Sequence, residues 1–355
     1  MRASGARPDR DPRPGTRPLC HNPPMAAHPY DALTPECILD AVESTGLRCD
    51  GRLLELNSFE NRVYQIGTED ARGGSRPIIG KFYRPGRWSD AAIREEHAFA
   101  LELAAAEIPV VAPLPDADGE TFHEHAGFRF ALYPQRGGRS PDLEQPEVLE
   151  RIGRFIGRIH TVGAAAPFLH REVMDLTGLA TAAREDVLSG EHLPPELVSV
   201  YRDLSADLIE RLRDFEPILG EVPAIRLHGD THRGNLLWTD AGPHFVDLDD
   251  ARTGPAVQDL WMFLSGDTPT MTGQLLDLLE GYEDFRPFDR RELALIAPLR
   301  ALRILRHAAW LARRADDPAF VQGFPVFYTP RFWEEHILTL REQRAALDEP
   351  PLNLP

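Results

Sequence analysis

One stretch of the chain constrains the fold more than any other. Residues 227–250 read LHGDTHRGNLLWTDAGPHFVDLDD, in which two short apolar runs are joined by a turn at Gly242. Two such runs around a glycine turn predict a β-hairpin. Asp230 and Asn235 precede its first strand and Asp247 follows its second, so the three side chains can meet in one place. Oxygen ligands of these types suit Mg²⁺ and a phosphate rather than a packed core.

The size and composition of the chain favour a soluble protein with two lobes. Its 355 residues exceed the usual size of one hydrophobic core. Hydrophobic residues make up 42% of the chain and charged residues 27%, as in ordinary globular proteins. The formal net charge of −17 argues against a nucleic acid partner, which needs a basic face. The sequence has no run of about 18 apolar residues, so we expect no membrane partner.

The N-terminal residues and the cysteines bear on where the chain works. Residues 1–24 are rich in Arg, Pro and Gly and lack apolar periodicity, which predicts a disordered tail rather than a secretory signal. A plausible domain start follows Met25, so translation from that methionine is an alternative. The three cysteines are few, odd in number and without metal-ligand spacing. They indicate a reducing compartment with free thiols.

Residues 25–134 have the pattern of a small β-rich lobe. Alternating apolar residues and polar turns predict a five-stranded antiparallel sheet with one inserted helix. The segment 108–114 reads as an extended apolar strand, and its two prolines place it at an edge of the sheet. The other elements are a helix after Thr34, a hairpin over 53–66, a strand over 77–83, a helix over 91–106 and an antiparallel pair over 121–133.

The rest of the chain is predominantly helical. Residues 135–145 break every regular pattern and are interpreted as the linker between two lobes. From 146 to 355 apolar residues recur at helical spacing, apart from the hairpin. Gly153 lies beside the apolar face of the first of these helices and would permit close packing. Pro298 should kink or split a helix predicted over 290–314. The predicted fold class is therefore α+β.

Lys81 lies on the strand over 77–83 among apolar neighbours. A surface lysine that extends its ammonium group to water would fit there, and so would a cation that reaches into a phosphate site. The helix over 91–106 follows, with Glu95 and Glu96 in its second turn. One of these carboxylates could pair with Lys81 and hold it in place, while the other remains solvated.

The polar loop and the lysine match the parts that phosphoryl transfer from ATP requires. Kinases use an Asp that accepts the proton of the acceptor hydroxyl and an Asn, five residues later, that binds magnesium. Asp230 and Asn235 have this spacing, and Asp247 would supply a second magnesium ligand. A GxGxxG loop is absent, so Ser58 and its neighbouring asparagines would have to serve the phosphates. We therefore expect ATP and Mg²⁺ at this site.

Other polar residues near the loop each allow two interpretations. His228 could hold the loop by a hydrogen bond or take part in catalysis, and His232 could contact substrate or backbone. Asp249 would share a side with Asp247 if the strand alternation continued, which favours a role beside the metal. Asp259 could brace the loop from a helix N-terminus or simply complement the helix dipole.

The residues carry a resemblance to a known group of enzymes. The motif HGDxHxxN at 228–235 with DxD at 247–249 resembles the aminoglycoside phosphotransferase and choline kinase group of protein-kinase-like enzymes. Within that group, the sequence outside these two motifs is similar to a bacterial branch of stress-response kinases. It is carried by LNSFENRVYQ (56–65), KFYRPGRW (81–88), EEH (95–97), FVDLDDAR (245–252) and GPAVQDLWM (254–262). The similarity runs from about Thr34 to Leu352, whereas the N-terminal tail and an insert at 72–76 depart from it.

This resemblance implies a two-lobed protein-kinase-like fold. It also implies an ATP-dependent serine/threonine protein kinase that autophosphorylates and acts in the cytoplasm in stress responses. It carries Asp230 over as proton acceptor, with Asn235 and Asp247 as magnesium ligands. It also assigns three residues to the nucleotide, listed here by role: Ser58 beside the phosphates, Lys81 on them, and Glu96, rather than Glu95, as the partner of the lysine. The lobes would be a nucleotide-binding lobe over 25–134 and a catalytic and substrate lobe over 146–355, in a monomer.

Three alternatives stay open at the level of sequence. A small-molecule kinase of the homoserine, choline or aminoglycoside type would use the same fold and the same residues. A pseudokinase scaffold would have no need of the intact loop. A binuclear metal hydrolase would leave the lysine and Asn235 without a role. Its metal ligands would be His228, Asp230, His232, Asp247 and Asp249.

Overall fold

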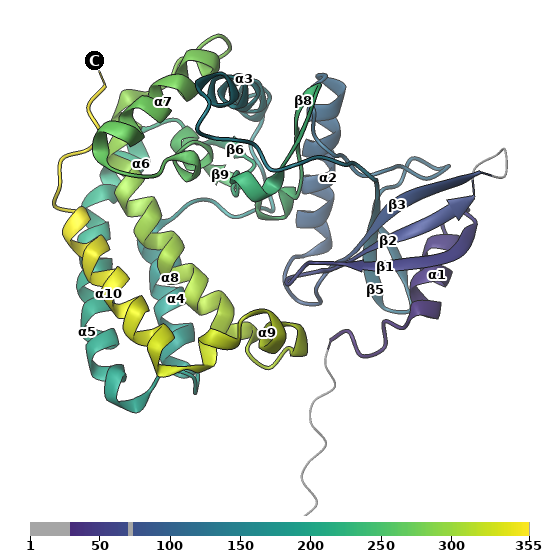
Figure 1. Ribbon diagram of the computed structural model, residues 1–355, viewed down its shortest axis with the longest axis horizontal. Helices are drawn as coiled ribbons and strands as arrows, with labels where there is room; N and C mark the ends of the chain where they lie inside the picture. The colour runs from purple at the N-terminus through teal and green to yellow at the C-terminus, as the bar shows by residue number, and fades with distance from the viewer. Residues whose placement is uncertain (1–28, 70–73, 355) are drawn as a thin grey trace, which may run out of the picture.

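A five-stranded antiparallel sheet forms the core of the N-terminal lobe (Figure 1). The computed structural model describes residues 29–69 and 74–354, so the tail predicted over 1–24 lies outside the described residues. The strand order is β1-β2-β3-β5-β4. The elements of this lobe are α1 (Pro35–Glu43), β1 (Cys49–Leu56), β2 (Arg62–Glu69), β3 (Ser75–Phe82), α2 (Asp90–Ala105), β4 (His123–His125) and β5 (Phe128–Pro134).

The alternation of side chains along β3 decides which face of the sheet receives the lysine. Phe82 is fully buried and packs with Phe130 and with Ile38 of α1 on one face. Lys81 pairs in register with Val63 of β2 and Ala131 of β5, and its side chain belongs to the opposite face. Helix α2 covers that face, so the lysine lies between the sheet and α2.

The sequence predicts that the segment 108–114 is an edge strand of the sheet, and this prediction is wrong because the segment bridges to the hairpin instead. Among the described residues this segment adds no strand to the sheet; it crosses to the other lobe and forms one parallel bridge between Val110 and Phe245. Val111 donates its N–H to the Phe245 carbonyl at 2.9 Å, and Phe245 donates to the Pro109 carbonyl at 2.8 Å. Proline lacks an N–H, which limits ladder pairing here to a single bridge. The segment thereby ties the sheet lobe to the hairpin.

The C-terminal lobe is mostly helical and carries the short strands of the site (Figure 1). The β7–β8 hairpin is present where the sequence predicts it, and β6 pairs with β9 beneath it. Together the lobes make a two-lobed α+β fold. The bounds are α3 (Pro146–Gly163), α4 (Leu176–Ser189), α5 (Pro195–Leu212), α6 (Glu216–Glu221), β6 (Ile225–Leu227), β7 (Leu236–Thr239), β8 (Gly242–Phe245), β9 (Arg252–Gly254), α7 (Thr268–Tyr282), α8 (Ile296–Arg314), α9 (Pro318–Gly323) and α10 (Pro330–Ala346).

The helix predicted over 290–314 is divided, and its proline is accommodated near the division. A 3₁₀ helix (Arg290–Leu295) precedes α8, so Pro298 falls in the first turn of α8, where the missing N–H has no intrahelical acceptor to lose.

Helix α4 is a further element that the periodicity did not predict. Within residues 29–69 and 74–354, every helix is too short or too polar to cross a membrane.

Close packing of α3 on α7 confirms the interpretation of Gly153. A Cβ atom at Gly153 would lie 1.8 Å from the carbonyl oxygen of Leu278 on α7. From the other side, a Cβ at Gly281 would lie 2.0 Å from the carbonyl oxygen of Glu150. The two helix backbones therefore touch, and any larger residue at these positions must push them apart.

We expect Gly153→Ala to lower the free energy of unfolding by about 1–3 kcal/mol, because the added methyl overpacks two backbones. Gly273→Ala is the matched control, since it lies on α7 with nothing within 4 Å of its added Cβ. There the better helix propensity of Ala should be neutral or slightly stabilising. Thermal unfolding of both variants checks this; equal melting temperatures would contradict the packing argument.

Candidate active site

Asp259 holds the polar loop that follows β6. Its carboxylate accepts the backbone N–H of His228 at 2.9 Å and that of Gly229 at 2.8 Å, and its carbonyl accepts from the Thr231 hydroxyl at 2.8 Å. His160 contacts the same carboxylate at 3.1 Å. Burial opposes the ionised form, but these hydrogen bonds outweigh it and hold the pKa of Asp259 below its ordinary value. Of the two roles considered for this residue, the structure shows the brace.

The loop is also locked onto the segment that contains the other carboxylates. His228 donates from Nε2 to the Val246 carbonyl at 2.9 Å, which is a structural role. Gly229 has a φ of +86°, and a Cβ there would lie 2.2 Å from the Asp250 carbonyl oxygen. Only glycine satisfies both conditions without strain. The loop of Asp230 and the segment of Asp247 therefore form one unit.

Asp230 lies at the surface of a cavity, and its carboxylate contacts an arginine and a histidine. One oxygen pairs with a guanidinium nitrogen of Arg303, and the other lies 3.3 Å from Nε2 of His232. Asn235 donates from Nδ2 to the Asp230 carbonyl at 2.9 Å. Burial raises the pKa of this carboxyl, but His232 and Arg303 outweigh it and lower the pKa below its ordinary value. The group is therefore an anion at neutral pH.

Asp247 follows β8 and projects into the same cavity. Its backbone is left-handed, with φ 62° and ψ 67°, which is uncommon for a residue with a side chain. The left-handed turn ends the strand alternation, so the sequence argument that placed Asp249 beside Asp247 used the wrong geometry. Both nevertheless contact the same cation, because a 3₁₀ turn (Leu248–Asp250) brings Asp249 back. About half of the Asp247 side chain (53%) is exposed, which leaves oxygen free for a ligand.

Lys81 is the cation on which these carboxylates converge. Its ammonium nitrogen lies 3.0 Å from Asp247, 3.1 Å from Asp249 and 3.8 Å from Glu96. Burial works against a charged lysine, yet the three carboxylates together raise its pKa well above the ordinary value. Glu95 takes no part: its carboxylate accepts backbone N–H groups of Leu169 and of the next residue at 2.6 and 2.7 Å.

Two arginines that sequence reasoning missed complete the charge balance. Arg87 pairs with Asp249 and, at 3.2 Å, with Asp250. Arg171 lies 3.7 Å from Glu96 and stacks on Trp88 with its guanidinium carbon 4.1 Å from a ring centroid. Burial raises the pKa of Glu96 to about 7, although Lys81 and Arg171 pull it down. Arg171 had no detectable signal, since it is a single arginine in its segment, whereas Arg87 belongs to the KFYRPGRW segment (81–88) that carries the resemblance.

The β1–β2 connection, residues 57–61, closes the cavity from the sheet lobe. Ser58 lines the cavity, while the carboxylate of Glu60 binds Arg314 at 2.7 Å and the Trp310 Nε1–H at 2.6 Å on α8. Asn61 donates to Asp249 at 3.3 Å. The connection is therefore anchored on the helical lobe and stands over the carboxylates.

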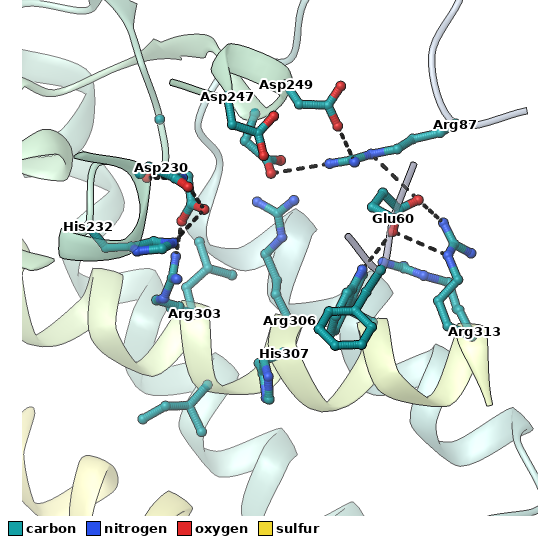
Figure 2. Close-up of a pocket in the computed structure, with 18 of the residues that line it drawn as sticks. Glu60, Arg87, Asp230, His232, Asp247, Asp249, Arg303, Arg306, His307 and Arg313 are labelled. Carbon is teal, nitrogen blue, oxygen red and sulfur yellow. Dashed lines mark hydrogen bonds and ion pairs between the residues drawn. The ribbon is translucent and has the colours of Figure 1, made fainter. Parts of the chain in front are cut away.

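One cavity of about 1020 Å³ unites the predicted site residues (Figure 2). Ser58, Asp230, Asn235 and Asp247 line it. Lys81 and Glu96 lie behind that surface and reach it through the ion pairs of the lysine. Figure 2 also shows arginines of α8 along the opposite wall, which the sequence analysis did not single out. The sequence feature that could have indicated them is the recurrence of arginine every three residues, at Arg300, Arg303 and Arg306.

The donor set fits Mg²⁺ held jointly with phosphates. Within the described parts of the chain, no group of three or more His, Cys, Asp or Glu side chains could hold a metal ion alone. Magnesium at phosphate sites, however, uses only one or two protein oxygens and takes the rest from phosphates and water. The carbonyl oxygen of the Asn235 side chain and the exposed carboxylate of Asp247 supply that number.

We expect Asp259→Asn to lower the free energy of unfolding by about 1–3 kcal/mol, because one buried loop N–H would then face an amide NH₂. Exposed Asp267, which caps α7 through the Thr270 N–H, serves as the control, and its Asn variant should keep the cap. Urea unfolding measures stability, and hydrogen exchange at His228 and Gly229 locates the loss. Unchanged exchange at both amides would contradict the bracing role.

The phosphotransferase enzyme family matches residues 52–296 of the chain. Stress response kinase A of Escherichia coli (strain K12) is 42% identical over 334 residues, which cover 93% of this chain and 98% of that protein. The serine/threonine protein kinase RdoA of Salmonella typhimurium is 42% identical over 328 residues, with coverages of 92% and 98%.

Solved structures share the fold at much lower identity. An amicoumacin kinase in complex with AMP-PNP, Ca²⁺ and Ami aligns with a TM-score of 0.63 at 18% identity and covers 88% of this chain and 93% of that one. Choline kinase LicA from Streptococcus pneumoniae aligns with a TM-score of 0.59 at 15% identity, with coverages of 88% and 99%. At these identities the alignments show the fold alone, and this is the two-lobed protein-kinase-like fold.

Proposed function

Because the chain belongs to the phosphotransferase enzyme family, we propose that it is an ATP-dependent serine/threonine protein kinase. The chain is a phosphotransferase with a hydroxyl acceptor. The observation that carries the finer proposal is the cavity in which Asp230, Asn235 and Asp247 meet, with Lys81 paired to Asp247. The protein acceptor is supported by the name of a relative that matches almost the whole chain. ATP is supported by the AMP-PNP complex of a protein with the same fold.

Each site residue then has one role. Asp230 is ionised and positions the acceptor hydroxyl, whose proton it receives late in a loose transition state. Asn235 and Asp247 would hold Mg²⁺, which when bound neutralises charge on the phosphates. Lys81 binds the phosphates and Glu96 keeps it in position. The backbone N–H and the hydroxyl of Ser58, in the β1–β2 connection, donate hydrogen bonds to the phosphates.

The proposal extends to the organisation and setting of the protein. The lobe over 25–134 binds the nucleotide, the linker over 135–145 lets the lobes move, and the lobe over 146–355 supplies catalysis and the acceptor site. The protein acts as a cytoplasmic monomer in a stress response and autophosphorylates. The names of the relatives support the stress response. A small alcohol as acceptor remains the competing proposal, and the acceptor assay described below separates the two.

We expect Asp230→Asn to reduce phosphate transfer by about 100-fold or more, because an amide cannot accept the hydroxyl proton. ATP binding should persist, since Asp230 is not assigned to the nucleotide. Asp240→Asn, an exposed change in the β7–β8 turn, is the control and should retain full transfer. Labelled ATP with a generic protein substrate measures the rate, and choline and homoserine run in parallel. Full turnover by Asp230→Asn would remove this residue from the proton-accepting role.

For Asp247→Asn we expect ATP affinity to lose most of its dependence on Mg²⁺. Titration of ATP by calorimetry, with and without excess Mg²⁺, measures this. Asp277→Asn, on α7 away from the cavity lining, serves as the matched control. If both variants keep an equal magnesium effect, Asp247 does not hold the ion.

A further inference from the structure

Two arginines of α8 face the catalytic loop across the cavity. Arg303 and Arg306 are three residues apart, so they project from one side of the helix. Both line the cavity, and Figure 2 shows their side chains directed from α8 toward Asp230 and Asp247. The proposed roles of the site residues leave both arginines without a task.

Arg303 stands where the acceptor must approach. Its guanidinium pairs with Asp230, the carboxylate that has to meet the acceptor hydroxyl. The side chain of Arg303 is 45% exposed, so it is free to turn without rearranging the core. An acceptor that brings its own negative group can take over this guanidinium and release the carboxylate. A cationic acceptor would be repelled at the same place.

Arg306 has a positive charge that its surroundings do not balance. Among the described residues its one ion pair is with Glu172 at 3.8 Å, and Glu172 also faces Arg252 at 3.4 Å. Burial, together with the charge of Arg252, lowers the pKa of Arg306 to about 10. Asp250 also attracts Arg306, but Arg87 and Arg252 already pair with that carboxylate at 3.2 and 3.0 Å.

The neighbouring arginines of the helix differ in this respect. Arg313 pairs with Asp186, and Arg314 pairs with Glu60 of the β1–β2 connection. Their charges are therefore used within the fold. Arg303 pairs with Asp230 at the point where the acceptor must bind, and within the described part of the chain Arg306 has only the 3.8 Å contact with Glu172. These two are therefore the cations of α8 that an acceptor at Asp230 can reach. A planar guanidinium binds carboxylates and phosphates through paired hydrogen bonds, so the matching ligand is an anion.

We propose that Arg303 and Arg306 bind a negative group that the acceptor carries close to its hydroxyl, so that the preferred substrate is a serine or threonine flanked by acidic residues. This inference rests on the proposed kinase function and deepens it. Because Arg303 contacts the proposed base itself, the negative group lies within one or two residues of the acceptor hydroxyl. Cationic alcohols of the choline or aminoglycoside type would be repelled by the positive charges of Arg303 and Arg306.

The first test compares matched acceptors with the full chain, Mg²⁺ and labelled ATP. Three peptides share a central serine, which is flanked by glutamates, glutamines or lysines. We expect the glutamate peptide to have a kcat/KM at least tenfold above the glutamine peptide, and the lysine peptide to be the poorest. Glycerate and glycerol 3-phosphate form a separate arm, and faster labelling of these than of the glutamate peptide would overturn the peptide assignment. Equal rates for the three peptides would overturn the anionic acceptor.

The second test changes the arginines. Arg306→Gln should raise the KM of the glutamate peptide about tenfold, and Arg306→Glu should reverse the order of the glutamate and lysine peptides. Arg341→Gln, an exposed change on α10 outside the cavity, removes the same charge and should leave all rates unchanged. A rise in melting temperature on adding Mg²⁺ and ATP shows that each variant is folded. An unaltered peptide preference in Arg306→Glu would overturn the inference.

Mg²⁺-dependent hydrolysis of ATP by the unmodified chain distinguishes a failure of the acceptor inference from a failure of the kinase proposal. If the chain turns over ATP but has no preference among the peptides, the acceptor inference fails and the kinase proposal stands. If neither ATP hydrolysis nor any labelled acceptor is found, the kinase proposal itself fails and the inference fails with it.

Discussion

The whole site depends on the balance of charge around Lys81. Glu96 of α2 and two carboxylates of the segment after β8, Asp247 and Asp249, approach one ammonium group. Without cations, two carboxylates about 4 Å apart at an effective dielectric of ~20 would repel each other by about 4 kcal/mol. Lys81 removes that cost in the absence of nucleotide, with help from Arg87 at Asp249. The lysine, from the sheet lobe, thereby holds the carboxylates of the helical lobe in the positions that a magnesium ion and a phosphate would need.

Helix α8 is the second structural requirement, because it serves both sides of the cavity. Its C-terminal end binds the β1–β2 connection through Glu60, and the turn after it carries Asp317, which pairs with Arg62 and Arg84 of the sheet lobe. Its middle presents Arg303 and Arg306 to the catalytic loop. One helix therefore both links the two lobes and lines the cavity with positive charge. Changes in the closure of the lobes would move these charges as well.

Local patterns were enough to predict the hairpin, the strand of Lys81 and the helix with Glu96, because each depends on residues adjacent in sequence. The partner of the segment 108–114 was not predictable in this way, since its bridge to Phe245 joins residues far apart in the chain. The same holds for the α8 arginines, which in sequence look like the solvated face of a helix. Asp249 was placed beside Asp247 by strand alternation, whereas the structure achieves it through a left-handed residue and a 3₁₀ turn. Tertiary contacts, which no local pattern contains, decided each of these cases.

The loop after β6 is held by many buried contacts, whereas the arginines of α8 are held by few. The catalytic loop is bound to Asp259, to Val246 and, through Gly229, against the Asp250 backbone, so a substitution there disturbs several buried hydrogen bonds at once. The side chains of Arg303 and Arg306 are partly exposed and make few contacts with the fold. They can be exchanged at little cost in stability. Under the proposed function, acceptor choice belongs to α8 and the chemistry to the loop after β6. Arg306 can then change without a contact to Asp230 being lost, whereas Arg303 contacts Asp230 directly.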